Sequence, residues 1–296
     1  MKSTVLRIAL LQQQITASVD DNIEMHLASI KQAVQQKAQL VVLPELHNTR
    51  YFCQQENMDY FNLAESIPGP TTETFCKLAR QHRIVIVASL FERRAAGLYH
   101  NTAVVIDSDG TIAGIYRKMH IPDDPGYYEK YYFTPGDLGF KPIQTSLGKL
   151  GVLVCWDQWY PEAARLMSLA GAQLLIYPTA IGWEPTDPDF EKQRQLQAWI
   201  TIQRSHAIAN GIPVLSCNRV GIETSTASDN QQIHFWGNSF ACDSFGYILA
   251  QANNQHAESV MIDIDFQQTE VSRKMWPFMR DRRIDEYRGL LERWLD

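Results

Sequence analysis

Cysteine is scarce in this 296-residue chain, and its spacing excludes two common kinds of site. The five cysteines are an odd number, lie far apart and include no C-x-x-C pair, which argues against zinc-ribbon and thioredoxin-type motifs. Widely spaced thiols without a pairing pattern are typical of proteins kept in a reducing compartment, so we expect a cytoplasmic protein. The cysteines are Cys53, Cys76, Cys155, Cys217 and Cys242.

Long apolar runs and blocks of positive charge are also missing. The apolar run Val5–Leu11 near the N-terminus ends at three glutamines, so we predict neither a signal peptide nor a membrane span. The formal net charge is -6 and no Lys/Arg block occurs, which argues against a nucleic-acid surface. We therefore expect no nucleic-acid or membrane partner, and the mild acidity suits a cationic small molecule.

The sequence does contain a regular alternation of strands and helices. Apolar residues make up 45% of the chain, which is enough for a large core. Continuous apolar runs bounded by turn residues predict buried strands, and apolar residues at helical spacing predict helices. Asp20 or Asp21 can cap the first helix, and the Asp109-Gly110 dipeptide predicts a hairpin turn. In order, we expect a strand over Val5–Gln14, a helix over Asn22–Gln36, a strand over Ala38–Leu46, a helix over Thr71–His82, a strand over Ile84–Leu90 and a hairpin over Asn101–Arg117.

The second half of the chain repeats this pattern. AQLLIYPTA at Ala172–Ala180 nearly copies AQLVVLPEL at Ala38–Leu46, and each copied element lies about 130–140 residues after its partner. Strands that alternate with helices predict a sheet with one face covered, and two such halves can bury their free faces against each other. We therefore predict an α/β fold, a four-layer αββα sandwich of two pseudo-symmetric halves in one domain over residues 1–296. The remaining copies are a strand over Lys149–Asp157, a helix over Phe190–Asn210, a strand over Ile212–Asn218 and a hairpin over Asn238–Ala252.

The C-terminal part adds a strand over Ser259–Phe266 and then a tail that begins at about residue 267. Within the tail, the run WPFMRDRR mixes apolar anchors with charges. We expect the tail to pack on a partner subunit, with a solvated tail as the alternative.

Three reactive side chains follow core strands, each where a strand is predicted to end. Glu45 follows LVVLP, Lys118 follows TIAGIYR and Cys155 follows GVLV. Ligands and catalytic groups gather at strand ends in α/β folds, so we expect the three side chains to meet. Glu45 can take the thiol proton and later activate water as a general base. Lys118 can stabilise a thiolate and an oxyanion.

Cys155 lies between a strand and a helix that is predicted to open near Pro161. Backbone N–H groups at the start of a helix are unpaired, so this position favours a thiolate and offers donors to an oxyanion. The backbone N–H of Trp156 is the second expected oxyanion donor, beside Lys118. A buried and inert cysteine is the alternative, because free cysteine is among the most buried residue types.

These motifs resemble those of the nitrilase, or carbon–nitrogen hydrolase, superfamily. The matching stretches are LPEL at Glu45, YRKMHIP at Lys118 and CWDQWYPE at Cys155, and the resemblance covers almost the whole chain. It implies the αββα fold, a Glu-Lys-Cys triad and a covalent thioester-type intermediate formed without a metal or an organic cofactor. It also implies that Glu129, in GYYEKYYFTPGD, assists as a second glutamate and that the chain forms homo-oligomers.

Within the superfamily, HIPDDPGYYEKYYFTPGD, IGWEP and FMRDRR resemble the subfamily that hydrolyses N-carbamoylputrescine. This resemblance implies release of putrescine, ammonia and carbon dioxide, a step of polyamine synthesis from agmatine. Acids and aromatic rings together suit an alkylammonium substrate. The expected substrate-binding residues are Tyr51, Asp123, Tyr127, Trp156 and Glu184.

Three alternatives stay open at this point. Relatives with the same triad act on other ureido compounds or amides, as β-ureidopropionases and ω-amidases do. A second alternative is a non-catalytic oligomeric binding protein with a relic site, although all three triad residues are intact. A Cys155–His120 pair is a rival mechanism, but the cysteine signature of papain-like proteases is absent. We expect His120 to order the loop after Lys118 instead.

Overall fold

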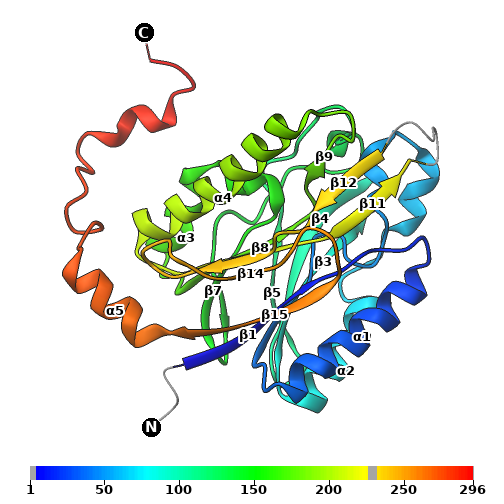
Figure 1. Cartoon of the computed structure of the whole chain (residues 1–296), viewed down its shortest axis with the longest axis horizontal. Coiled ribbons are helices and arrows are strands. Elements are labelled where there is room, and N and C mark those ends of the chain that lie inside the picture. Colours follow the sequence, from blue (N-terminus) through cyan, green and yellow to red (C-terminus); the bar gives the residue numbers. More distant parts are fainter. Residues whose placement is uncertain (1–4, 226–231, 296) are drawn as a thin grey trace.

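The computed structural model describes residues 5–225 and 232–295 of the chain. Two six-stranded sheets lie face to face, and helices cover the outer face of each sheet (Figure 1). This arrangement is the four-layer αββα sandwich expected from the internal repeat.

The first sheet comes mainly from the first half of the chain. Its strand order is β15-β1-β2-β3-β4-β5. The central strands β1, β2 and β3 run parallel, whereas β15, β4 and β5 pair antiparallel with their neighbours. The strands are β1 (Val5–Gln12), β2 (Leu40–Val42), β3 (Val85–Ala95), β4 (Leu98–Ile106), β5 (Ile112–Arg117) and β15 (Glu258–Asp265).

The second sheet repeats this arrangement. Its order is β14-β13-β10-β8-β7-β6, so the run β7-β8-β10-β13-β14 reproduces the run β1-β2-β3-β4-β5. Again the first three strands are parallel and the last two form an antiparallel hairpin. The repeat is therefore confirmed as two pseudo-symmetric halves. The strands are β6 (Ile143–Thr145), β7 (Gly148–Val152), β8 (Leu174–Thr179), β10 (Val214–Asn218), β13 (Phe240–Cys242) and β14 (Ile248–Gln251).

Side chains along β1 alternate between two layers of core. Ile8 and Leu10 join the main core, which holds residues of both sheets. Ala9 and Leu11 pack instead in the cluster under the helices of the first half. Because both faces of such a strand are buried away from water, its sequence is a continuous apolar run. The covering helices are α1 (Val19–Gln35) and α2 (Pro70–His82) in the first half, and α3 (Pro161–Leu169) and α4 (Asp189–Asn210) in the second.

Two local features differ from the expectation. The cap of α1 is Ser18, whose Oγ accepts a hydrogen bond from the Asp21 N–H at 3.1 Å, so Asp20 and Asp21 lie in the first turn of the helix. A small antiparallel sheet, β11-β12-β9, lies outside the repeat. Its strands are β9 (Gly182–Trp183), β11 (Val220–Thr224) and β12 (Gln232–Trp236).

The tail contains α5 (Phe266–Met275) directly after β15, and a later 3-10 helix, η5 (Tyr287–Leu291). Figure 1 shows that the tail extends away from the sandwich. Many of its apolar side chains are exposed: Met275, Trp276, Phe278, Ile284, Leu290, Leu291, Trp294 and Leu295. Among the described residues, no helix combines the length and the apolar character needed to cross a membrane.

Candidate active site

Four reactive side chains from distant segments come together in one place. Glu45 lies in the turn after β2, and Lys118 directly follows β5. Glu129 and Cys155 open two 3-10 helices, η3 (Glu129–Tyr131) and η4 (Cys155–Trp159). All four are buried. Charged groups are rarely buried unless they are paired, and here the three charged side chains pair with one another.

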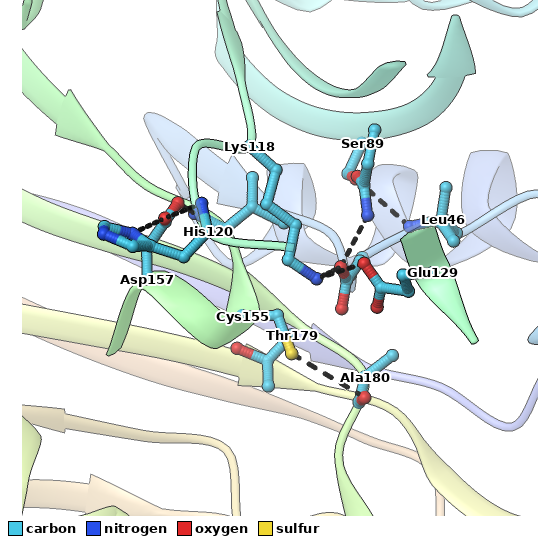
Figure 2. A network of polar contacts seen from close by, with 12 residues as sticks. Leu46, Ser89, Lys118, His120, Glu129, Cys155, Asp157, Thr179 and Ala180 are labelled. Atoms are coloured by element: carbon cyan, nitrogen blue, oxygen red, sulfur yellow. Dashed lines mark hydrogen bonds and ion pairs between the residues drawn. The ribbon is translucent and has the colours of Figure 1, made fainter. Parts of the chain in front are cut away.

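Lys118 lies at the centre of this cluster. Its Nζ donates to Glu45 Oε1 at 2.8 Å. It also donates to Glu129 Oε2 at 2.6 Å (Figure 2). Burial by itself lowers the pKa of an ammonium group, but Glu129, Glu45 and Cys155 act in the opposite direction. The pKa of Lys118 is raised well above its ordinary value as a result. Lys118 therefore supplies a fixed positive charge.

The two carboxylate oxygens of Glu45 have different surroundings. Oε1 accepts hydrogen bonds from Lys118 Nζ and from Asn101 Nδ2, the latter at 2.7 Å. Oε2 is buried and has no hydrogen-bond partner among the residues that the structure describes. A buried acceptor without a partner is costly, so Oε2 is suited to receive a proton. The sequence pattern did not reveal Asn101; its one signal was a polar side chain inside the apolar strand β4.

Glu129 is held from two sides. Its Oε2 accepts from Lys118, and its Oε1 accepts from the Tyr51 hydroxyl at 2.6 Å. Burial raises the pKa of Glu129 to about 7, with Lys118 opposing this rise and Glu45 adding to it. Tyr51 was expected to bind substrate, but it is only 1% exposed and does not line the cavity described below. In the structure the Tyr51 hydroxyl contacts Glu129 instead.

Cys155 lies at a strained point of the backbone. Its φ is 43°, in the left-handed region that is unfavourable for a residue with a Cβ. Its Sγ lies 3.8 Å from the carbonyl oxygen of Ala180 (Figure 2). Burial and then Glu45 raise the pKa of the thiol well above its ordinary value, although Lys118 opposes them. This direction is opposite to the thiolate-favouring environment expected from the start of a helix.

Asp157 joins η4 to the loop that follows β5. Its carboxylate accepts a hydrogen bond from the Tyr116 hydroxyl at 2.8 Å. His120 Nδ1 lies 2.6 Å from Asp157 Oδ1, and the His120 backbone N–H donates to the same oxygen at 3.1 Å. The His120 ring also stacks on Tyr160, with ring centroids 3.7 Å apart. His120 therefore orders this loop, and its ring is engaged with Asp157 and Tyr160 rather than with Cys155.

A cavity of about 1040 Å³ reaches the buried cluster, where Cys155 and Glu129 form part of its wall. Much of the remaining wall is aromatic, and it includes two of the residues expected to bind substrate, Tyr127 and Trp156. The backbone N–H of Gly182 donates to the Tyr127 hydroxyl at 3.1 Å and so holds that ring in place. The other aromatic lining residues are Trp159, Trp183 and Trp236.

Acidic side chains also line the cavity. Glu184 was expected there, whereas Asp123 is exposed and does not line it. The sequence pattern did not single out Asp187 and Glu191, because they belong to a polar loop and the first turn of a helix. Arg194, the one basic lining residue among those described, pairs with Glu191 at 3.0 Å. The acidic lining residues besides Glu129 are Asp124, Glu184, Asp187 and Glu191.

In the described part of the chain, no group of three or more His, Cys, Asp or Glu side chains is placed to hold a metal ion.

The chain is similar over almost its whole length to proteins of known sequence and structure. A family model described as carbon-nitrogen hydrolase matches residues 7–274. An N-carbamoylputrescine amidase of Solanum lycopersicum is 40% identical over 98% of this chain and 96% of its own length. A citrullinase of Francisella tularensis is 39% identical over 98% of this chain and 99% of its own length. The crystal structure of a carbon-nitrogen hydrolase from Helicobacter pylori G27 has a TM-score of 0.96 and 52% identity, and covers 98% of this chain and 100% of that chain.

Proposed function

The chain belongs to the carbon–nitrogen hydrolase family, and we propose that it is a thiol amidohydrolase that converts N-carbamoylputrescine to putrescine, ammonia and carbon dioxide. In this proposal Cys155 is the nucleophile, Glu45 is the general base, and Glu129 holds the charged Lys118 in place. The observation that carries the proposal is the position of Lys118, between two carboxylates and in electrostatic contact with the Cys155 thiol.

The first step is addition of the Cys155 thiol to the carbamoyl carbon, while the thiol proton passes to Glu45. A base is needed because burial and Glu45 keep the pKa of the thiol high, and the unpartnered Oε2 of Glu45 suits this task among the described groups. The new C–S bond converts the carbonyl to a tetrahedral oxyanion. Lys118 and the backbone N–H of Trp156, the residue after the nucleophile, stabilise that charge.

The second step is collapse of the tetrahedral intermediate and hydrolysis of the adduct. One C–N bond breaks, the departing nitrogen takes the proton from Glu45, and a thioester-type adduct remains on Cys155. Glu45 then deprotonates a water molecule, which attacks the adduct, breaks the C–S bond and restores the thiol. The released carbamate loses carbon dioxide. One N-carbamoylputrescine and one water thus give putrescine, ammonia and carbon dioxide.

Intact-mass spectrometry of acid-quenched turnover mixtures tests this chemistry. We expect a covalent adduct on the wild-type chain and none on Cys155→Ala, in which ammonia release falls by more than about 1,000-fold. The mass of the adduct identifies the nitrogen that leaves first, because the adduct either retains or lacks the putrescine chain. Ammonia release that survives in Cys155→Ala would overturn the proposal.

The cavity supports a cationic substrate. Tyr127, Trp156 and Glu184 lie along its wall with further acids, and aromatic faces together with carboxylates attract an alkylammonium chain. The tomato enzyme that is 40% identical to this chain is an N-carbamoylputrescine amidase, which supports the same substrate.

Arg194 favours a second candidate substrate, citrulline. A tail with one ammonium and one carboxylate group suits a wall that includes Arg194 as well as Glu184 and Asp187, and one relative at 39% identity is a citrullinase. Because Arg194 already pairs with Glu191, less of its positive charge is available to a substrate carboxylate. We therefore place citrulline second. Purely anionic substrates of the β-ureidopropionase or ω-amidase type fit an acidic wall less well.

We also propose that the protein works in the cytoplasm as a homo-oligomer, without nucleic-acid or membrane partners. The tail supports assembly, because exposed apolar side chains such as Trp276 and Phe278 mark interaction surfaces. All five cysteines are free, which agrees with a reducing compartment.

A further inference from the structure

A buried ion pair lies behind Glu45, outside the proposed catalytic set. Arg219 directly precedes β11 and Glu223 lies on it, and their side chains are 0% and 2% exposed. Arg219 Nη1 donates to Glu223 Oε1 at 2.7 Å. Neither residue lines the cavity, so any effect on the reaction has to pass through other groups.

Arg219 holds the backbone that carries Glu45. Its Nη2 donates to the carbonyl oxygen of Glu45 at 2.6 Å and to that of Leu46 at 3.0 Å. Leu46 has a φ of 48°, which is unfavourable for leucine, so the turn needs support from outside. The planar guanidinium reaches both carbonyl oxygens and Glu223 at once, and a lysine ammonium does not have this geometry.

Glu223 reaches toward the second carboxylate of the site. Its Oε2 accepts a hydrogen bond from the backbone N–H of Tyr51 at 2.6 Å. The Tyr51 hydroxyl in turn donates to Glu129 Oε1 at 2.6 Å. One ion pair from the second half of the chain therefore supports both first-half segments that present carboxylates to Lys118, one directly and one through Tyr51.

We propose that Arg219 and Glu223 are positioning residues, which hold Glu45 and Tyr51 where Lys118 and Cys155 require them. This inference rests on the proposed role of Glu45 as the base. A displacement of about 1 Å at a reacting group can cost roughly 100-fold in rate. Loss of the pair is therefore expected to act on the chemical step more than on substrate binding.

Glu223→Gln and Arg219→Lys test the proposal, with Glu92→Gln as the matched control. Glu92 belongs to another buried ion pair, with Arg117 at 2.6 Å, and its remaining hydrogen bond comes from Thr102. The first readout is kcat and KM for ammonia release from N-carbamoylputrescine. The second readout needs no substrate: it is the rate at which iodoacetamide alkylates Cys155, followed by site-resolved mass spectrometry.

We expect kcat to fall by about 10- to 100-fold in both test variants while KM stays within about twofold, and alkylation of Cys155 to slow in parallel. Glu92→Gln is expected to lose thermal stability but to keep kcat and the alkylation rate. If Glu223→Gln does not fold, Arg219→Lys, which keeps the positive charge beside Glu223, carries the same test.

The positioning role is wrong if the two test variants change only the melting temperature, as the control does. Glu45→Gln separates this failure from a failure of the proposed function. Wild-type ammonia release in Glu45→Gln would show that the assigned base is wrong. If Glu45→Gln loses most of its ammonia release while Glu223→Gln and Arg219→Lys keep full activity, the positioning role of the ion pair is wrong and the proposed function stands.

Discussion

At the scale of single residues, the hydrogen bonds of Glu129 determine how the site responds to pH. Both of its carboxylate oxygens accept, one from Tyr51 and one from Lys118, so the geometry is that of the ionised group. Protonation turns one oxygen into a donor that faces another donor, which breaks one of these bonds. Because burial raises the pKa of Glu129 to about 7, this change falls in the physiological range.

We predict that kcat of the wild-type protein rises with pH as Glu129 ionises near pH 7. In Glu129→Gln, kcat is expected to be roughly 100-fold lower and to lose this rise with pH. The contribution of Glu129 to folding stability has the opposite dependence on pH. A carboxyl group whose pKa rises on folding from 4.5 to about 7 stabilises the fold below pH 4.5 and loses that contribution as the pH rises to about 7. Ammonia release and thermal unfolding across this range measure both effects, and identical pH profiles of wild type and variant would contradict the assignment.

The sequence predicted those site residues that follow core strands, and it missed those that reach the site from segments distant in the sequence. Glu45, Lys118 and Cys155 were predicted because each follows a predicted core strand, and their catalytic roles stay predictions. Asn101 and Arg219 contact Glu45 only in the folded chain, so no local pattern assigns them to the site. The thiolate-favouring environment expected at Cys155 rested on local reasoning about a helix start, which leaves out burial and Glu45, and both of these raise the pKa of the thiol.

At the scale of elements, the small sheet β11-β12-β9 links the cavity wall to the core. Gly182 on β9 lies so close to β12 that a Cβ there would be 2.4 Å from the His234 carbonyl oxygen and 2.7 Å from the Phe235 Cα. These are backbone atoms, which cannot rotate away as a flexible side chain can. A larger residue at this position has to displace a strand.

We predict that Gly182→Ala lowers the free energy of unfolding by about 1–3 kcal/mol and raises KM, because Gly182 also holds the Tyr127 hydroxyl at the cavity wall. Gly97→Ala is the control: a Cβ there meets nothing within 4 Å in the described structure, and only its φ of +72 is unfavourable. Urea unfolding and steady-state kinetics measure the two effects. An unchanged KM in Gly182→Ala would show that β9 does not position the cavity wall.

The elements of the repeat were predictable for a physical reason. Strands that are buried on both faces are continuous apolar runs, and two copies of each run strengthen the signal. The sheet β11-β12-β9 lies outside the repeat, and its strand β9 has only 2 residues. So short an element has too few residues to show a periodicity.

At the scale of the whole molecule, the two halves depend on each other. The first half supplies Glu45 and Lys118, the second supplies Cys155, and Arg219 of the second half holds the backbone of Glu45. The tail extends away from the sandwich (Figure 1), and many of its apolar side chains are exposed.

We predict that the full-length chain sediments as a homo-oligomer and that removal of residues 276–296 yields a smaller species with unchanged secondary structure. The reason is that the removed segment exposes apolar side chains such as Trp276, Phe278 and Trp294, which a partner subunit can bury. Analytical ultracentrifugation and circular dichroism measure the two properties. A monomeric full-length chain, or an assembly that the deletion leaves intact, would contradict a docking role for the tail.

The most direct test of the central claim is ammonia release by the purified full-length protein from ureido compounds that differ in the charge of the tail. The panel holds cationic N-carbamoylputrescine, zwitterionic citrulline, anionic β-ureidopropionate and neutral N-butylurea, with Cys155→Ala as the control. We predict the highest kcat/KM for N-carbamoylputrescine and loss of all release in the variant. A preference for citrulline or β-ureidopropionate would contradict the cationic substrate, and release by Cys155→Ala would contradict the thiol mechanism itself.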